Sequence, residues 1–465
     1  MADKQSTKPP SGTRDFLPQD VRRREHVIRV VRGVYERYGF EPLETPAFEN
    51  IETLLGKSGD EGNKLIFKIL KRGEHASTGE ADLALRYDLT VPLARVVAQY
   101  QNELPKFFKR YQIQPVWRAD RPARGRFREF FQCDLDSIGS MSPVVEVEQV
   151  SAVCQVLQEL GFCKHGVGRF QVRLNHRRLL ATLLQSYGIS NEKHSDALVA
   201  LDKLDKIGIE GVARQLNQRG IDATVSGPLL EMFAKAKSVS DITSALWDAK
   251  STNEMWFNEF KNRFPNEPAL EELKTIVELA SSTPAARWLA VDPSLARGLS
   301  YYTGAIMEIS VDGLAGSLGG GGRYDNLVGM FLGRDVPACG FSLGLERMIV
   351  VMTERNMFPA ELAVGGVDVM VTVWNDDSRA DALAVAAELR KGGLRVDVYP
   401  EADKLGKQFK YASSRNVPFV AILGDDERAR GEVAVKDLRS ADQTLVPRAN
   451  VVEYIRRRLT PVTQT

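Results

Sequence analysis

A long antiparallel hairpin between residues 106 and 139 constrains the fold of this chain more than any other feature. Two runs of aromatic and β-branched residues flank the basic turn RPARGR, whose proline and glycine interrupt the strand pattern. Strand-like runs around such a break predict a hairpin. A strand pattern returns at residues 299–311 and 338–343, so we expect all of these segments to belong to one antiparallel sheet.

Helical patterns precede and interrupt this sheet. Apolar residues recur at helical spacing over residues 21–38, and Gly39 should end that helix. The next stretch, FEPLETPAFE, holds two prolines between apolar residues, which favours an extended edge segment around Pro46. From about residue 179 to 281, stretches such as SDALVALDKLDKIG and LLEMFAKAKSV are helical in pattern and predict an inserted helical module.

Strand and helix patterns alternate after Pro359, from VDVMVTVW through ALAVAAELRKGG, LRVDVYP and GKQFKYASSR to VPFVAILG. This alternation predicts a small parallel α/β domain, which a helix over residues 449–459 should close. A chain of 465 residues favours two or three domains. The predicted division is the first part of the sheet domain at 1–178, the helical insertion at 179–281, the second part of the sheet domain at 282–358 and the α/β domain at 359–465.

Composition excludes several classes of protein. Sixty-two Lys and Arg balance 61 Asp and Glu, so a net charge of +1 gives no global nucleic-acid signature and any RNA contact must be local. The four cysteines include no CxxC pair, which argues against disulfides and zinc and favours a reducing cytoplasm. The first ten residues are polar and no apolar run is long enough to cross a bilayer, so we expect no membrane association.

A basic arm from Arg118 to Arg128 is the first candidate for chemistry. Residues 106–128 hold eight basic side chains and one acid, Asp120. An arginine can grip a phosphate with two hydrogen bonds and stays charged at any working pH, so the arm predicts an anion site. For an isolated cluster, a solvated surface turn would be the favoured explanation, but the strand that follows favours the anion site.

Two polar rows accompany this arm. In the strand after the turn, Gln132, Asp134 and Asp136 alternate with apolar residues and should share one face. Amide and carboxylate groups beside phosphate-binding arginines suit a pocket for a cationic ammonium group. In LALRYDLTVPLAR, Arg86, Asp88 and Thr90 alternate in the same way, which predicts a second polar row on a buried strand or, alternatively, a solvent-facing edge.

Paired tyrosines lie downstream in RGLSYYTGAIMEI. Tyr301 and Tyr302 follow Arg297 and should point to opposite sides of a regular strand, so one of them should face the pocket. The alternative is that the pair consists of buried structural tyrosines.

Two glycine-rich segments complete the candidate site. Four glycines at residues 319–322 precede Tyr324 and would let the backbone approach a ligand closely, although the GxxxxGK[ST] phosphate loop is absent. PACGFSLGLERMIV reads as a strand that passes through Gly340 and Gly344 into a helix with Arg347 on its first turn. This junction could admit a flat base or a triphosphate, but helix packing alone could also require the glycines.

Together and in this order, these blocks resemble the class II aminoacyl-tRNA synthetases, specifically the histidyl-tRNA synthetase family, over nearly the whole chain. The resemblance is carried by SGTRDFLP, LRYDLTVPLAR, RADRPARGRFREFFQCDLD, LARGLSYYTG and GGGGRYD. It implies an α+β class II catalytic domain with an antiparallel sheet and flanking helices, an inserted helical module and a C-terminal α/β anticodon-binding domain. It also implies a homodimer built around the segment with Pro46, with L-histidine, ATP, Mg²⁺ and tRNA(His) as ligands.

The resemblance further implies roles for individual residues. Arg118 and Arg297 would act catalytically at the α-phosphate, while metal ligands are not identified. The residues implied for ATP are Arg118, Asp120, Arg126 and Arg347. Those implied for histidine are Asp88, Thr90, Gln132, Asp136, Arg297, Tyr302 and Tyr324. Two positions depart from the family pattern, since Ser300 replaces a frequent Asp, and Asp136 is one methylene shorter than the Glu of many bacterial members.

Two other functions compete with the enzyme. A synthetase-like regulatory subunit would sense histidine without charging tRNA, but such proteins usually lack an anticodon domain. A tRNA-binding sensor domain would need fused modules, for which the ends of the chain leave no room. The α/β segment after Pro359 and the retained arginines favour the ligase.

Overall fold

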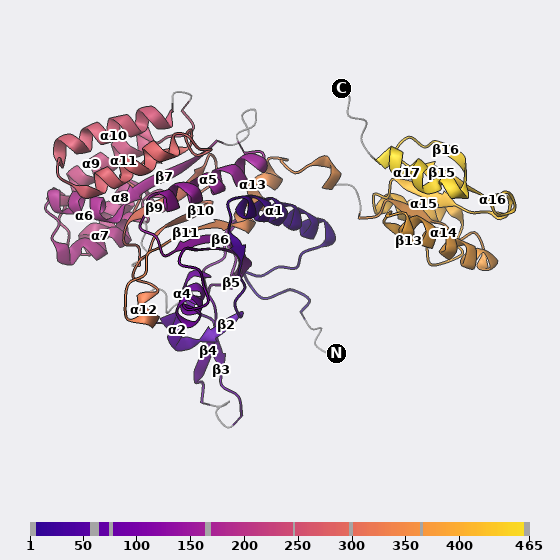
Figure 1. The fold of residues 1–465 in the computed structure, drawn as a ribbon, viewed down its shortest axis with the longest axis horizontal. Coiled ribbons are helices and arrows are strands. Elements are labelled where there is room, and N and C mark those ends of the chain that lie inside the picture. The colour runs from indigo at the N-terminus through magenta and orange to yellow at the C-terminus, as the bar shows by residue number, and fades with distance from the viewer. Residues whose placement is uncertain are drawn as a thin grey trace. The chain divides into compact units, whose positions relative to one another are not determined.

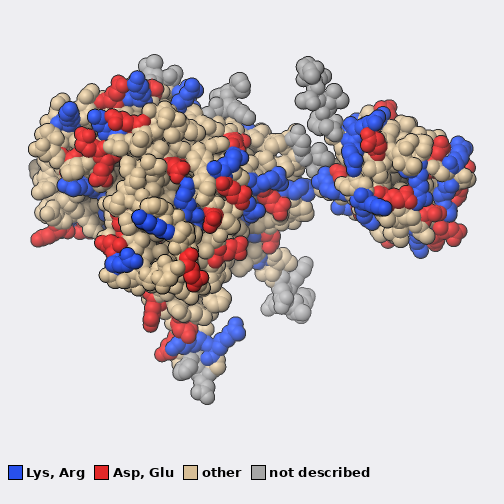
Figure 2. Space-filling model, in the orientation of Figure 1, with Lys and Arg blue, Asp and Glu red and all other residues tan. Residues whose placement is uncertain are grey.

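The computed structural model describes residues 6–55, 65–73, 78–162, 169–244, 247–296, 301–362 and 366–459. The chain divides into two compact units, Met1–Met357 and Phe358–Thr465, which we describe separately. In Figure 2, basic and acidic residues are interspersed over the visible face, in keeping with the net charge of +1. Across the described ranges, we find no helix with the length and apolar character needed to cross a membrane.

An eight-stranded sheet forms the centre of the first unit (Figure 1). Its strands, in spatial order, are β1 (Glu41–Pro42), β5 (Phe108–Trp117), β6 (Glu129–Ile138), β11 (Ala338–Gly344), β10 (Gly319–Arg323), β9 (Ala305–Val311), β7 (Phe170–His176) and β8 (Leu289–Val291). The β5–β6 hairpin confirms the predicted one, and β1 is the predicted edge segment. The pairs β1–β5 and β7–β8 are parallel, so the sheet is antiparallel only in its interior.

Three helices cover one face of this sheet: α1 (Pro18–Arg37), α5 (Val144–Glu159) and α13 (Leu345–Glu354). Helix α1 starts three residues earlier than expected because Pro18 suits a first helical turn, and it ends just before the left-handed Gly39. The short strands β2 (Phe48–Asn50), β4 (Ala81–Leu85) and β3 (Lys68–Leu70) form a second sheet, next to α2 (Ile51–Leu55) and α4 (Thr90–Gln99). The small helix α12 (Gly329–Leu332) contacts α4.

The predicted helical insertion is present in the first unit. It comprises α6 (Arg177–Ser186), η2 (Asn191–Lys193), α7 (His194–Leu201), α8 (Leu204–Gln218), α9 (Ala223–Val239), α10 (Ala249–Arg263) and α11 (Pro268–Ala280). The stretch 195–208 is not one helix, because the chain breaks between α7 and α8 and again at Gly208, whose φ of 67° is left-handed. Helices α10 and α11 pack on β8, and α11 also contacts α5, so the insertion is anchored to the sheet.

The second unit contains a five-stranded sheet in the order β13 (Val396–Val398), β12 (Val369–Val371), β14 (Phe419–Ile422), β15 (Glu432–Asp437) and β16 (Gln443–Pro447). Only β13, β12 and β14 are parallel; β15 and β16 add an antiparallel edge that the predicted parallel domain did not include. Residues of α14 (Arg379–Lys391) and α17 (Val451–Leu459) enter one apolar cluster, and those of α15 (Leu405–Ser414) enter another. Shorter helices are η3 (Ala360–Leu362), η4 (Asp376–Ser378), α16 (Asp425–Arg430) and η5 (Arg448–Asn450).

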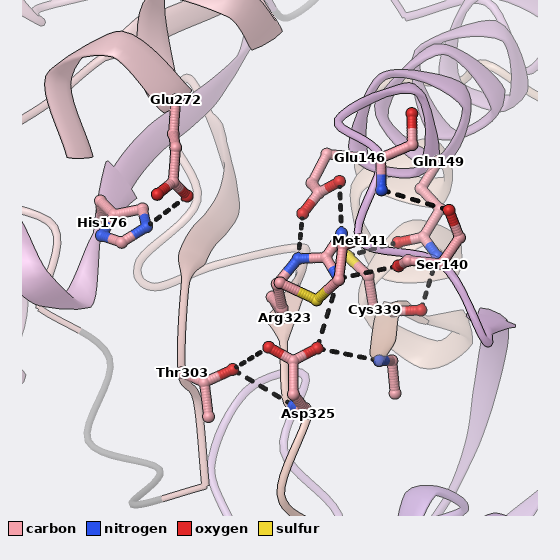
Figure 3. A network of polar contacts seen from close by, with 12 residues as sticks. Ser140, Met141, Glu146, Gln149, His176, Glu272, Thr303, Arg323, Asp325 and Cys339 are labelled. Atoms are coloured by element: carbon pink, nitrogen blue, oxygen red, sulfur yellow. Dashed lines mark hydrogen bonds and ion pairs between the residues drawn. The ribbon is translucent and has the colours of Figure 1, made fainter. Parts of the chain in front are cut away.

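A buried polar network ties helix α5 to strands β10 and β11 (Figure 3). Glu146 of α5 accepts two hydrogen bonds from the Arg323 guanidinium, at 2.6 and 2.9 Å. Arg323 also contacts Asp325, which accepts a 2.8 Å hydrogen bond from the Thr303 hydroxyl. Gln149 of α5 donates to the Cys339 carbonyl at 2.7 Å. The network therefore fixes Thr303, which follows Tyr302, and both residues that flank Tyr324.

The consecutive glycines of β10 let three strands approach closely. A Cβ atom at Gly321 would lie 2.1 Å from the Gly340 carbonyl oxygen, which is backbone and cannot rotate away. We predict that Gly321→Ala lowers the free energy of unfolding by about 1–3 kcal/mol, because the sheet must widen to accommodate the methyl group. Chemical denaturation of the purified variant measures this change.

Gly33→Ala in helix α1 is the matched control. Its new methyl group would meet only Arg37, at an ordinary 3.9 Å, and alanine favours a helix interior by roughly 0.5–1 kcal/mol over glycine. We expect this variant to be at least as stable as the parent chain. Equal stability of the two variants would contradict the steric role of Gly321.

Candidate active site

A cavity of about 450 Å³ opens on the central sheet of the first unit. This volume is typical of small-molecule sites. Its walls come from β6, β10 and β11, the β5–β6 turn, the connection between β4 and α4, and the start of α13. The predicted site residues that line it are Asp88, Thr90, Arg118, Asp120, Arg126, Gln132, Asp136, Tyr302, Tyr324 and Arg347. Arg297 and Ser300 lie outside the described residues.

The predicted polar row of β6 forms one wall of the cavity. Gln132, Asp134 and Asp136 all line it, as expected from strand alternation, and all three are buried. Asp136 forms a 2.8 Å ion pair with the fully buried Arg110 of β5 and accepts a hydrogen bond from the Tyr324 hydroxyl. The acid is therefore held by Arg110 of the neighbouring strand β5 and by Tyr324, which directly follows β10.

Burial changes the protonation of these acids. Desolvation raises the pKa of Asp136, although Arg110 and the Tyr324 hydroxyl oppose this effect. Desolvation, opposed by Arg110, also raises the pKa of Asp134, to about 7. A cationic ligand would stabilise the ionised form of both carboxyl groups, so this wall is suited to an ammonium group.

Two oxygens on this wall have neither a hydrogen bond nor an ion pair to any residue that the structure describes. They are Oε1 of Gln132 and Oδ1 of Asp134, and both are buried. Gln132 is nevertheless fixed, because its Nε2 donates to the Ser342 hydroxyl at 2.8 Å. A buried acceptor without a donor is unfavourable by about 1–3 kcal/mol, so these atoms indicate a donor-bearing ligand.

The prediction that Arg86, Asp88 and Thr90 lie on one strand is wrong. Strand β4 ends at Leu85, and Thr90 already begins α4. Asp88 precedes the N-cap residue Leu89, and its carboxylate accepts the backbone N–H of Val91 in the first turn of that helix at 3.1 Å. Asp88 and Thr90 still line the cavity, but they do so from a loop and a helix. Burial raises the pKa of Asp88 as well.

Arg86, the first member of that row, does not line the cavity. Its buried guanidinium donates to the carbonyl oxygens of Thr45, Pro46 and Pro115 at 2.6–3.0 Å. It therefore fastens the segment around Pro46 to strand β5.

Three arginines, Arg118, Arg126 and Arg347, also line the cavity. Arg118 donates through Nε to the Tyr87 carbonyl at 2.8 Å, and its guanidinium lies 5.2 Å from the Phe130 ring centre. Arg126 forms a two-bond ion pair with Asp120, at 2.8 and 3.2 Å. Thus two residues predicted to bind one ligand bind each other in this structure.

The third of these arginines, Arg347, lies on the first turn of α13 as predicted and donates to the Ser317 carbonyl. Burial, and secondarily the charge of Arg126, lower the pKa of Arg347. An anion in the cavity would relieve this repulsion between the two guanidinium groups.

Both tyrosines of the pair line the cavity, so the expectation that only one faces it is wrong. Strand β9 starts at Ala305, and residues 301–304 precede it, so the alternation of a regular strand does not apply. The two rings lie 4.8 Å apart, and Tyr301 meets the edge of Tyr324 at 6.1 Å. Together with Tyr302, these rings form an aromatic wall next to Asp136.

The glycines act in two ways. Gly319 and Gly320 line the cavity, in keeping with a close approach of backbone to ligand. Gly340 instead makes room for the acid wall, since a Cβ there would lie 1.8 Å from Oδ1 of Asp136.

Several residues that line the cavity or support its wall were not assigned a role from the sequence. Asp134 was placed in the polar row without a role, and Arg110 was counted only as one of the basic residues. The residues Arg110, Gln112 and Gln114 alternate on β5 and pair in register with Asp136, Asp134 and Gln132. That alternation is a signal in the sequence, but recognising it requires the hairpin register. Lys206 also lines the cavity, from helix α8.

Comparisons with known proteins agree with this geometry. A family model described as histidyl-tRNA synthetase matches residues 12–348, and one described as an anticodon binding domain matches residues 368–458. The chain is 39% identical over 463 residues to a histidine–tRNA ligase of Christiangramia forsetii, covering 96% of this chain and 97% of that protein. It is 38% identical over 454 residues to one of Phocaeicola vulgatus, covering 94% and 96%.

Solved structures show the same fold. The crystal structure of histidyl-tRNA synthetase from Nostoc sp. PCC 7120 matches with a TM-score of 0.78 at 30% identity, covering 98% of this chain and all of that chain. An ATP phosphoribosyltransferase regulatory subunit/histidyl-tRNA synthetase from Bacillus halodurans matches with a TM-score of 0.70 at 20% identity, covering 89% and 98%. The predicted class II fold with a C-terminal anticodon-binding domain is confirmed. The chain belongs to the histidyl-tRNA synthetase family.

Proposed function

We propose that this chain activates L-histidine with ATP, forming histidyl-adenylate and pyrophosphate, and then transfers histidine to the 3′ end of tRNA(His). The observation that carries this proposal is one cavity that joins buried, partly unpaired carboxylate and amide oxygens to three arginines. The acids suit an ammonium group, and the arginines suit phosphates. Membership of the family supplies the identity of the amino acid.

Activation requires the histidine carboxylate to attack the α-phosphorus of ATP in line, with pyrophosphate leaving. We assign Arg118 and Arg297 to the charge that develops at this phosphorus. Asp120, Arg126 and Arg347 are assigned to the remainder of ATP. Catalysis by such a site consists mainly of positioning and charge stabilisation, so no acid–base group is required for this step.

Histidine recognition divides between two walls. We assign Asp88, Thr90 and Gln132 to the α-amino group, because the Gln132 amide offers a buried, unpaired oxygen. Asp136, Tyr302 and Tyr324 are assigned to the imidazole ring. A site that pairs both ring nitrogens leaves its own polar groups unsatisfied with an apolar amino acid, which is the basis of strong discrimination.

Mg²⁺ fits this site as a companion of ATP. Within the described ranges, no group of three or more His, Cys, Asp or Glu side chains could hold a metal ion. Mg²⁺ commonly binds through substrate phosphates with few protein carboxylates and several waters. We propose that it enters with ATP and neutralises phosphate charge.

The second unit is assigned to tRNA. Its family model is an anticodon binding domain. It presents a Trp374 side chain that is 43% exposed after β12, and three consecutive arginines in the last turn of α17. An exposed ring can stack on an unpaired base, and arginines can contact phosphates. We place the protein in the cytoplasm, since the buried Cys133 and Cys339 form no disulfide with any cysteine that the structure describes.

A regulatory histidine sensor is the competing function, and the Bacillus halodurans neighbour shares its fold with this chain. The cavity retains Arg118, Arg126 and Arg347, and the chain has an anticodon-binding domain, which together favour the ligase. Charging of purified tRNA(His) with radiolabelled histidine separates the two functions, because a sensor would bind histidine and form no histidyl-tRNA.

Removal of Arg297 tests the activation step. We predict that Arg297→Ala lowers the rate of histidine-dependent ATP–pyrophosphate exchange by about 10²–10³, as expected for loss of a group that stabilises transition-state charge. Arg287→Ala is the matched control, since Arg287 is exposed and does not line the cavity. Normal exchange in Arg297→Ala would refute the assigned role.

The pKa of Asp134 predicts a pH dependence. Below about pH 7 the Asp134 carboxyl of the empty site is neutral, and above it is ionised, so the KM for histidine should fall as the pH rises from 6 to 8. Asp134→Asn should raise the KM and flatten this dependence. Initial-rate exchange kinetics across the range measure both effects, and an equally steep profile in the variant would contradict the prediction.

We also propose a homodimer formed around the segment that contains Pro46. In the adjoining small sheet, the side chains of Phe48 and Leu70 are 50% and 56% exposed. A partner subunit that covered these two apolar side chains would remove them from water. We predict that Phe48→Asp converts the dimer to a monomer, as measured by light scattering coupled to size-exclusion chromatography. Leu445→Asp, in the second unit, removes a side chain of similar exposure and should leave the dimer intact. A dimeric Phe48→Asp protein would exclude this surface.

A further inference from the structure

The helical insertion places a lysine in the active-site cavity. Lys206 lies on the first turn of α8, in the LDKLDKIG stretch, and lines the cavity together with Arg126 and Arg347. Its side chain is exposed, and we find no hydrogen bond or ion pair to it from any residue in the described ranges. No role has so far been assigned to this ammonium group.

The neighbouring residue anchors Lys206 to the sheet. Asp205 accepts a 2.7 Å hydrogen bond from Arg173 of β7 and lies 3.4 Å from the Lys237 ammonium group. Arg173 is buried and also binds Asp292 at 2.7 Å and Glu308 at 3.2 Å. Arg173 is held by Glu308 of β9 and by Asp292, which directly follows β8. Its contact with Asp205 therefore fixes the start of α8 over the sheet.

The register of the sheet shows where this anchor lies. Asp134 pairs with Ser342, Ser342 with Gly320, Gly320 with Glu308, and Glu308 with Arg173. Directly paired residues present their side chains on the same face of a sheet. The anchor is therefore on the face that carries the cavity, at the end of a row that starts in the acid wall.

Two observations place Lys206 towards the arginines. Glu308, which binds the same guanidinium as Asp205, is close enough to Arg347 to oppose part of the lowering of its pKa. Asp134 lies at the opposite end of the row, three strand pairings from Glu308. The ammonium group thus extends the cationic part of the cavity, where a phosphate is the suitable ligand.

We propose that Lys206 binds a phosphate oxygen of ATP, on the pyrophosphate side, next to Arg347. This inference rests on the proposed ATP-dependent activation of histidine. The inserted module thereby contributes a residue to activation, and Asp205 acts as its positioning residue through Arg173. A terminal phosphate of tRNA has the same chemistry. Measurements with and without tRNA distinguish binding of that phosphate from binding of ATP.

The test is histidine-dependent ATP–pyrophosphate exchange without tRNA, using the full-length protein. For Lys206→Ala we expect the KM for ATP to rise about tenfold or more, as for loss of one charge-assisted hydrogen bond, while the KM for histidine stays within about twofold. Lys206→Arg should restore most of the ATP affinity because it keeps the charge. Asp205→Asn should raise the KM for ATP by a smaller factor.

Lys203→Ala is the matched control, because Lys203 lies in the same stretch but does not line the cavity. An unchanged KM for ATP in Lys206→Ala, with an active parent enzyme, would overturn the inference. A parent enzyme without histidine-dependent exchange would instead overturn the proposed function.

Single-turnover transfer from preformed adenylate to tRNA is the second measurement. We expect the transfer rate of Lys206→Ala to match that of the parent enzyme. If transfer alone were slowed and exchange were normal, Lys206 would contact tRNA, and the assignment to ATP would be wrong.

Discussion

The ion pair between Arg110 and Asp136, buried between the two strands of the hairpin, is the interaction on which the rest of the site depends. Removal of a carboxylate from water is expensive, and a single buried acid would simply become neutral. Arg110 lies on the adjoining strand and opposes the rise in pKa that burial imposes on both Asp134 and Asp136. The sheet can therefore keep anionic groups at its centre, where an amino-acid ammonium group can reach them.

The structure around this pair explains how segments distant in sequence meet. Strands β10 and β11 bring Tyr324 and Gly340 next to Asp136. On the other side of the sheet, Glu146 and Gln149 of α5 hold these strands through Arg323 and the Cys339 carbonyl. The acid wall is thus supported by a second polar network that does not line the cavity.

Much of the site could be predicted because strand alternation has a period of two. Gln132, Asp134 and Asp136 share a face for this reason. Because they lie on the same hairpin as the arginine arm, their place beside it could also be predicted. The errors occur where no strand is present. Asp88 lies just before α4 and accepts a hydrogen bond from its first turn, and Tyr301 and Tyr302 precede β9, so in both places the side-chain directions depend on local turns. The role of Arg110 required the register between β5 and β6, which pattern alone does not provide.

The fold of the second unit was predicted less completely. Alternating strands and helices indicated the parallel part of the sheet. Strands β15 and β16, however, pair directly with each other, antiparallel and with no helix between them. Four of the five residues of β16 are exposed, and the strand is short, so its apolar signal is weak. The predicted domain boundaries at residues 178, 281 and 358 remain predictions.

The glycines of β10 and β11 have a consequence for altering specificity. At Gly319 and Gly340, which both line the cavity, the neighbouring atoms leave no room for even one methyl group, so this part of the cavity is bare backbone that cannot be reshaped by substitution. Selection of a different amino acid must therefore arise from the walls. Among these, Asp136 is coupled to Arg110 and Tyr324, so a useful redesign would have to exchange all three together.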